Sequence, residues 1–142
     1  MKKNVMLTFL FVMFCGFASA QIVGKWKTVD DETGQAKSIV EIYKKSDGKY
    51  YGKITELLVK PKNKECVKCV DDRKNSPIVG MEIIRGLKKE GDEYSQGTIL
   101  NPKNGKIYRC TIKRESGNRL RVRGFIGVSL LGKTQIWEEV KQ

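Results

Sequence analysis

The amino-acid sequence predicts an all-β fold, an eight-stranded antiparallel up-and-down barrel that follows an N-terminal signal peptide. Three observations support this prediction. Residues 24–140 contain about eight stretches in which apolar and polar residues alternate, the pattern of a half-buried strand. Turn motifs rich in Gly, Asn and Asp connect most of these stretches, and none has the 3.6-residue period of an amphipathic helix. Closing such a meander into a barrel removes its two exposed edges. An open two-sheet sandwich is the alternative.

The first 20 residues have the organisation of a secretory signal peptide. Lys2 and Lys3 precede the apolar residues 5–17, and Ala18-Ser19-Ala20 is a small-residue cleavage site. The apolar stretch is too short for a membrane-spanning helix, and no later segment reaches the roughly 18 apolar residues that such a helix needs. We therefore expect cleavage near Ala20-Gln21 and an exported protein, periplasmic or extracellular, with a single domain at residues 21–142.

Two alternatives for this N-terminal segment remain. Cys15 follows an apolar run, which is the pattern of a lipoprotein signal, but the bulky Phe14 precedes it where a small residue is preferred. The other alternative is an N-terminal buried helix.

The chain is strongly basic. Its formal net charge is +12, and +10 remains when Lys2 and Lys3 leave with the signal peptide. A basic surface favours solubility and contact with anionic partners, such as an anionic envelope component or an acidic small ligand. An exported protein with no recognition motif is not expected to bind nucleic acid.

The first strands are expected at residues 24–29, 36–45 and 49–57. Trp26 and Thr28 should share one face of the first strand. A turn cluster occupies residues 30–34, and Asp47-Gly48 is a strong hairpin motif between the second and third strands. Residues 59–80 show neither the two-residue period of a strand nor the 3.6-residue period of a helix. Irregular connections of this length often carry function. We expect them to form the rim of the barrel or a lid.

The second half of the chain again alternates. Its turns contain Gly91-Asp92, Asn101–Gly105 with a proline, and Ser116-Gly117-Asn118. The connection at residues 124–132 is apolar and spaced by glycines, so it needs a partner surface. The expected strands are 81–87, 94–100, 106–113, 119–124 and 133–140.

Several motifs resemble known families. Gly24-Lys25-Trp26 is similar to the glycine-x-tryptophan motif of the calycin barrels, which include lipocalins, fatty-acid-binding proteins and avidins. Six ordered motifs, spread over nearly the whole chain after residue 20, resemble a family of small exported bacterial proteins described as domain of unknown function 2147. These motifs are Gly24-Lys-Trp-Lys-Thr, Tyr50-Tyr-Gly-Lys-Ile, Gly86-Leu-Lys, Tyr94-Ser-Gln-Gly-Thr-Ile, Gly105-Lys-Ile-Tyr and Val122-Arg-Gly-Phe-Ile-Gly with Leu131-Gly-Lys-Thr-Gln-Ile-Trp137.

The resemblance implies a lipocalin-like barrel but no established activity. In a calycin barrel the tryptophan plugs the closed end and the glycine allows close approach of another backbone. A late basic residue commonly stacks on that tryptophan, and Arg121 and Arg123 are the candidates here. We expect Gly24 and Trp26 to meet Trp137, so that the first and last strands close the barrel.

Three cysteines follow the signal peptide. Cys66 and Cys69 form a Cys-x-x-Cys pair in the irregular loop, and Cys110 lies on an expected strand. Export favours a disulfide, and a Cys66–Cys69 bond is the first choice. The alternatives are a bond from one of this pair to Cys110, or a buried free thiol at Cys110.

Catalysis is difficult to build from this sequence. It contains no His, the commonest general base, and shows no nucleophile–base pair. We expect neither an enzyme nor a cofactor or metal site. Thiol–disulfide exchange at Cys66 and Cys69 is the main catalytic alternative, although no helix follows to lower a thiol pKa.

The barrel interior is therefore the candidate binding site. Ligand pockets are apolar with a few placed polar groups. The sequence leaves open which face of each strand points inward, because a slip of one residue reverses the set. The candidate ligand-binding residues are Trp26, Tyr51, Tyr94, Tyr108, Arg109, Phe125 and Gln135.

Two functions from different classes follow. The first is a binding protein that holds a small apolar or amphiphilic molecule in the barrel. The alternative is a non-catalytic interaction protein, whose solid barrel docks to an envelope partner through its basic surface.

Overall fold

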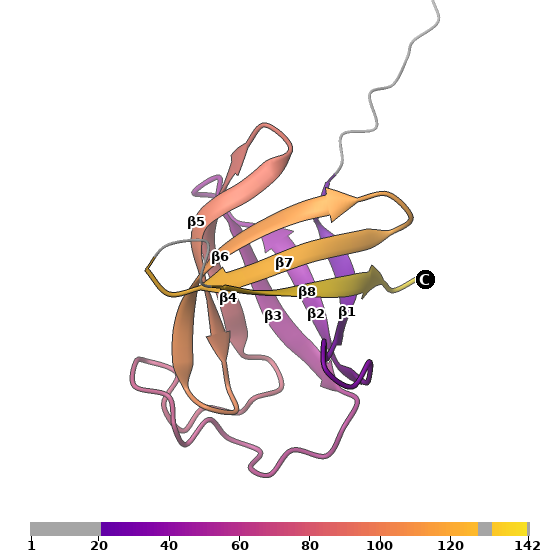
Figure 1. The fold of residues 1–142 in the computed structure, drawn as a ribbon. Coiled ribbons are helices and arrows are strands. Elements are labelled where there is room, and N and C mark those ends of the chain that lie inside the picture. The colour runs from indigo at the N-terminus through magenta and orange to yellow at the C-terminus, as the bar shows by residue number, and fades with distance from the viewer. Residues whose placement is uncertain (1–20, 128–131, 142) are drawn as a thin grey trace, which may run out of the picture.

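The computed structural model describes residues 21–127 and 132–141. This part of the chain contains eight strands: β1 Gly24–Val29, β2 Ala36–Lys44, β3 Tyr50–Leu57, β4 Glu82–Glu90, β5 Glu93–Asn101, β6 Lys106–Glu115, β7 Arg119–Phe125 and β8 Gly132–Glu139. Each strand pairs antiparallel with the next, and β8 returns to β1, so the sheet closes into a barrel (Figure 1). The predicted fold class is confirmed and the sandwich alternative is wrong. The expected signal peptide, with Cys15, lies outside the described residues.

The alternation of inward-facing and outward-facing residues along the strands determines which side chains form the core. Trp26 faces Val40 across the β1–β2 ladder, and all of its side chain is buried. Thr28 faces Ser38 in the same ladder, and both are buried, which matches the expected inward face of β1. All eight strands and the buried core lie between residues 22 and 139, so a chain that begins at Gln21 contains the whole barrel. The described residues include no helix that is long and apolar enough to span a membrane.

Glycines inside the barrel allow neighbouring side chains to fill it. A Cβ on Gly52 would lie 3.0 Å from Ile84, and one on Gly97 would lie 2.8 Å from Leu87 and 2.7 Å from the Arg85 carbonyl oxygen. These positions therefore accept large aliphatic neighbours because they carry no side chain themselves.

The long loop between β3 and β4 packs on the outside of the barrel. Leu100 lies next to Ile99 on β5 and therefore points outward, yet it is only 2% exposed. Cys66 and Cys69 belong to the same apolar cluster as Leu100, and a Cβ on Gly105 would collide with the Lys68 carbonyl group. The loop thus covers the β5–β6 turn, beside which it runs in Figure 1. The sequence predicted a rim or a lid; the loop lies at the rim of the barrel and also packs against its outer face.

Substitution of Gly97 tests the tight packing of the interior. We expect Gly97→Ala to lower the free energy of unfolding by about 1–3 kcal/mol, because the added methyl group overpacks Leu87 and the Arg85 carbonyl. Gly124→Ala is the matched control, since its nearest neighbours would lie 3.5 Å away. Urea denaturation followed by tryptophan fluorescence measures both. Equal stabilities of the two variants would contradict this account of the core.

Candidate ligand-binding site

The two ends of the barrel are built from different segments. We call one end the closed end; it is formed by residues 21–23 and the turns after β2, β4 and β6. The open end is formed by the turn at residues 30–35, the loop at residues 58–81, the turn at residues 102–105 and the β7–β8 connection. Within that connection, residues 128–131 lie outside the described part of the chain.

Aromatic side chains fill the closed end. Trp26, Tyr94 and Trp137 are each at most 2% exposed. The Trp26 Nε1–H donates a hydrogen bond of 2.7 Å to the Ile22 carbonyl oxygen, which holds the segment before β1 beneath the ring. Tyr50 meets Tyr94 edge to face, with 4.8 Å between ring centroids. This end of the barrel is therefore solid.

A basic residue covers Trp26, but it is Arg114. Its guanidinium carbon lies 5.3 Å from the centre of the Trp26 ring. Arg114 also donates hydrogen bonds to the Gln21 carbonyl oxygen at 2.7 Å and to Glu139 at 3.0 Å. One side chain thus ties β6 to both ends of the described chain, beside the seam between β1 and β8.

The prediction that Arg121 or Arg123 stacks on Trp26 is wrong. Leu120 and Val122 are buried on the inner face of β7, so the two arginines beside them point outward. Arg121 forms an ion pair with Glu115, and Arg123 donates to the Thr134 hydroxyl. The glycine-x-tryptophan motif identified Trp26 correctly, but it did not indicate which strand carries the basic residue that stacks on it.

Several inward-facing residues at the open end are partly exposed. Ile99, Tyr108 and Gln135 face inward, because each lies opposite an inward-facing residue in its ladder. They are nevertheless partly exposed, whereas Val40 and Ile112 deeper in the barrel are 0% exposed. The atoms nearest to a Cβ built on Gly124 would belong to Ile99 and Tyr108, both at 3.5 Å. Solvent therefore reaches the interior from this end.

The polar groups of this lining are neutral. The Thr28 and Ser38 hydroxyls are hydrogen-bonded to each other at 2.8 Å. Asn104 donates to the Tyr108 hydroxyl at 3.3 Å, and Gln135 accepts a hydrogen bond from the Trp137 indole N–H. Burial raises the pKa of the Cys110 thiol to about 12, so it stays protonated at neutral pH. The lumen can thus offer apolar surface and uncharged hydrogen-bonding groups.

Comparisons with known proteins agree with this architecture. A sequence model of the family described as "Uncharacterized protein conserved in bacteria (DUF2147)" matches residues 24–139. The chain belongs to the DUF2147 family. Among solved structures it is similar to the Helicobacter pylori protein HP1028, which is described as belonging to the lipocalin family. The identity is 21%, the TM-score is 0.73, and the match covers 85% of this chain and 84% of the other. No match was found among curated proteins.

The family resemblance predicted from the motifs is therefore confirmed, and so is the lipocalin-like fold. At 21% identity the likeness to HP1028 establishes the fold alone. The function of this DUF2147 protein must be argued from its own residues.

The structure divides the predicted interior residues into three groups. Trp26 and Tyr94 face inward but belong to the solid closed end. Tyr108 and Gln135 line the open end of the DUF2147 barrel. The other three candidates lie on the outer surface, which corrects the prediction that they face the lumen: Tyr51, Arg109 and Phe125.

The outward positions follow from strand register. Tyr51 lies opposite Tyr43, and its hydroxyl donates to Asp47. Arg109 lies opposite Phe125, one residue after the inward-facing Tyr108. Sequence reasoning missed Gly124, Thr28 and Ser38 as parts of the open end, although alternation from Trp26 indicated Thr28.

The disulfide lies between Cys66 and Cys69, as predicted, and Cys110 is a free buried thiol. Cys66 and Cys69 are 0% and 1% exposed, and the Cys66 sulfur lies 3.5 Å from the Pro102 carbonyl oxygen. In this position the bond clamps the tip of the loop against the β5–β6 turn.

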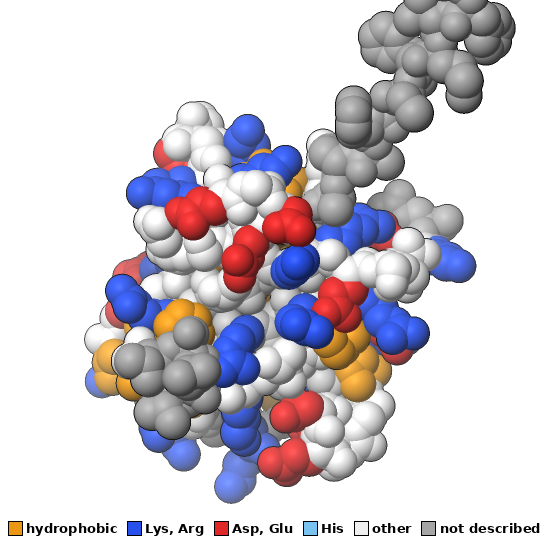
Figure 2. Space-filling model, turned by 45° about the horizontal axis from the view of Figure 1, so that its top comes forward, with side chains coloured by type: hydrophobic (Ala, Val, Ile, Leu, Met, Phe, Trp, Pro, Cys, Tyr) orange, Lys and Arg blue, Asp and Glu red, His pale blue; other side chains and the backbone are white. Residues whose placement is uncertain are grey.

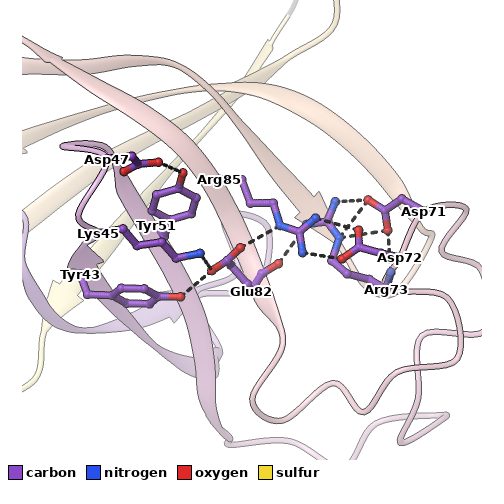
Figure 3. A network of polar contacts seen from close by, with 9 residues as sticks. All are labelled: Tyr43, Lys45, Asp47, Tyr51, Asp71, Asp72, Arg73, Glu82 and Arg85. Carbon is purple, nitrogen blue, oxygen red and sulfur yellow. Dashed lines mark hydrogen bonds and ion pairs between the residues drawn. The ribbon is translucent and has the colours of Figure 1, made fainter.

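A polar network fixes the remainder of the loop to the barrel wall (Figure 3). Arg73 is 5% exposed, and it donates to both Asp71 oxygens and to the Glu82 carbonyl oxygen. Arg85 reaches Asp72 with two hydrogen bonds, at 2.8 and 2.9 Å, and bonds the Glu82 carboxylate at 2.9 Å. The buried charge of Arg73 is tolerated because it is paired. The loop of this DUF2147 protein is therefore held at several points.

The same network extends across β2 and β3. Tyr43 donates to the Glu82 carboxylate at 2.7 Å, and the Lys45 ammonium group lies 2.8 Å from it. Lys45 also lies 3.9 Å from the centre of the Tyr51 ring. The tyrosines thus take part in an outer-surface network and not in the lumen, as Figure 3 shows.

The position of Arg114 predicts a difference between two arginine variants. Arg114→Ala should lower the free energy of unfolding by about 1–3 kcal/mol, because it removes a cation–π contact and two hydrogen bonds. Arg121→Ala should change it by less than about 0.5 kcal/mol, since a single exposed ion pair contributes little. Urea denaturation of the two variants compares them. A larger loss of stability in Arg121→Ala than in Arg114→Ala would instead support the sequence-based prediction that Arg121 stacks on Trp26.

The Arg73–Asp71 pair predicts acid sensitivity. Hydrogen bonds from Arg73 lower the pKa of Asp71 from 3.8 to about 2. Because the pKa is lower in the folded state, the stabilisation is complete above about pH 4 and is lost as the pH falls through 2. The stability advantage of the native protein over Asp71→Asn should therefore shrink between pH 5 and pH 2. Urea denaturation across this range measures it.

Asp31→Asn is the control for this experiment, because Asp31 is exposed and forms no ion pair in the described part of the chain. Its stability should follow that of the native protein at each pH. A constant difference between the native protein and Asp71→Asn from pH 5 to pH 2 would refute the assignment.

Proposed function

We propose that this DUF2147 protein binds a small apolar or amphiphilic molecule in the open end of its barrel after export to the periplasm or the cell exterior. The observation that carries the proposal is the contrast between the two halves of the interior. Aromatic and aliphatic side chains pack the closed end completely, whereas inward-facing residues at the open end keep contact with solvent.

The chemistry of the lining supports this class of ligand. Ile99, Val122 and Gly124 provide apolar wall, and the Thr28–Ser38 pair and Tyr108 provide uncharged hydrogen-bonding groups. Among the described residues, Lys133 lies on the lumen side at the mouth, where its side chain is 80% exposed, and the lining between it and Trp26 is uncharged. A ligand whose buried part is uncharged suits such a cavity, because an unpaired charge there would lose its hydration.

A fluorescent fatty acid tests the proposal directly. Titration of the chain Gln21–Gln142 with 11-(dansylamino)undecanoic acid should give a saturable increase in dansyl emission. Gly124→Leu should weaken this binding about tenfold or more, which corresponds to about 1.4 kcal/mol. The substitution is suited to the test because the Cβ has room at 3.5 Å and the rest of the side chain enters the lumen.

Arg109→Leu is the matched control. It introduces the same side chain on the outer face of the neighbouring strand, and it should leave the affinity unchanged. Tyr108→Ala, at the adjacent inward position, gives a second lumen variant if Gly124→Leu is poorly folded. An emission change that does not saturate, or an equal loss in Arg109→Leu and Gly124→Leu, would show that the probe does not bind in the barrel.

A further inference from the structure

The exposed apolar side chains are concentrated at the open end. In the described part of the chain eight large aliphatic side chains are exposed, and two of them, Val23 and Ile136, lie elsewhere. The other six belong to the loop at residues 58–81 or to strand ends at the open mouth: Leu58, Val67, Val70, Val79, Ile107 and Ile126. Apolar groups gathered at one end of a soluble barrel indicate a contact surface.

The loop presents its apolar tip on a rigid support. The Cys66–Cys69 disulfide buries both cysteines against the β5–β6 turn, so the residues between and after them point away from the barrel. Val70 is 83% exposed and Val67 is 46% exposed, with the exposed Lys68 between them in the chain. Because the barrel anchors this tip, it does not have to be ordered on contact, which lowers the entropic cost of binding.

Lysines surround these apolar residues. Seven lysines in the loop and the adjoining turn form no ion pair with any described residue: Lys60, Lys62, Lys64, Lys68, Lys74, Lys103 and Lys106. Of the three acids in the same loop, Asp71 and Asp72 are paired with Arg73 and Arg85, whereas the exposed Glu65 forms no ion pair with a described residue. Figure 2 shows one face of the molecule, on which Lys and Arg side chains are widely spread and apolar side chains gather on the left and on the right.

The acidic turn at Asp30, Asp31 and Glu32 limits the extent of this surface. It joins β1 to β2, on the opposite side of the barrel from the β5–β6 turn. The closed end has no comparable separation of charge, since its lysines stand among Asp47, Glu90, Asp92 and Glu93. The basic and apolar surface is therefore confined to the loop at residues 58–81, the turn at residues 102–105 and the adjoining ends of β6 and β7.

We infer that this surface docks onto an anionic phospholipid membrane. Aliphatic side chains that enter the headgroup region, surrounded by lysines that contact anionic headgroups, are the features of a peripheral membrane-binding surface. Docking there would bring the open mouth toward the lipid. The surface lies outside the lumen, so the inference stands independently of the proposed ligand.

Vesicle sedimentation tests the inference. The chain Gln21–Gln142 should sediment with vesicles of phosphatidylglycerol and phosphatidylcholine, and weakly or not at all with phosphatidylcholine alone. Binding should weaken between about 50 and 500 mM salt, as the screening length shortens from roughly 14 to 4 Å. Lys68→Gln/Lys74→Gln should weaken it about tenfold or more, given the contribution of each lysine near an anionic surface.

Matched pairs at other places in the barrel are the controls. Lys88→Gln/Lys89→Gln removes the same charge near the closed end and should have little effect. Val67→Ser/Val70→Ser should weaken vesicle binding, whereas Val23→Ser/Ile136→Ser should not. Equal losses in the two lysine variants would mean non-specific attraction, and absence of binding to anionic vesicles would also overturn the inference. So would self-association that covers Val67 and Val70.

The experiments distinguish failure of the ligand-binding proposal from failure of the membrane-docking proposal. Gly124→Leu should keep vesicle binding while losing the fluorescent fatty acid, and Lys68→Gln/Lys74→Gln should keep the fatty acid while losing vesicles. A variant that loses both while remaining folded would contradict the assignment of separate sites.

Discussion

Burial of two tryptophans at the seam between the first and last strands is the constraint on which this barrel depends. The β1–β8 ladder has two residue pairs, Trp26 with Glu139 and Lys27 with Glu138, against seven in the β7–β8 ladder. A backbone hydrogen bond contributes about 1 kcal/mol net, so this ladder alone closes the barrel weakly. Burying a tryptophan removes roughly 150–250 Å² from water, worth about 4–6 kcal/mol as an upper estimate. The closure is therefore mainly hydrophobic.

This distribution of the core has a consequence for the other end of the barrel. Because Trp26, Tyr94 and Trp137 stabilise the closed end, the open end does not need a filled interior. The outer apolar residue Leu100 is covered by the disulfide-clamped loop, which adds a second packed region outside the barrel. Stability is thus provided at the closed end and on the outer wall, whereas Ile99, Tyr108 and Gln135 at the mouth are partly exposed.

The sequence predicted the barrel well because its signals are local. Alternation and turn residues are read within short segments, and both agree with the closed topology. The inward face of each strand could not be read in this way, since register shifts interrupt the period. One lies between Tyr94 and Gly97, where Gln96 has a φ of 62°. Another lies between Tyr50 and Gly52, beside the misassigned Tyr51.

The polar network of the loop was also beyond sequence reasoning. Arg85 and Asp72 are 13 residues apart and meet only because β4 returns beside the loop. No period links them, and a buried arginine such as Arg73 is indistinguishable in sequence from the many solvated basic residues. Pairs of this kind depend on tertiary structure, whereas the Cys66–Cys69 disulfide could be predicted because its partners are adjacent in the chain.

The charges of the mouth and of the lumen together restrict the kind of molecule that fits. Transfer of an ionised group into the uncharged lumen would cost several kcal/mol, because no described side chain there could pair with it. A charged headgroup must therefore remain at the mouth. Lys133 lies opposite Gly124 in the β7–β8 ladder, on the lumen side; its side chain is 80% exposed, and its ammonium group lies 3.9 Å from the Glu32 carboxylate. An anionic amphiphile with its chain inside and its headgroup beside Lys133 satisfies both requirements.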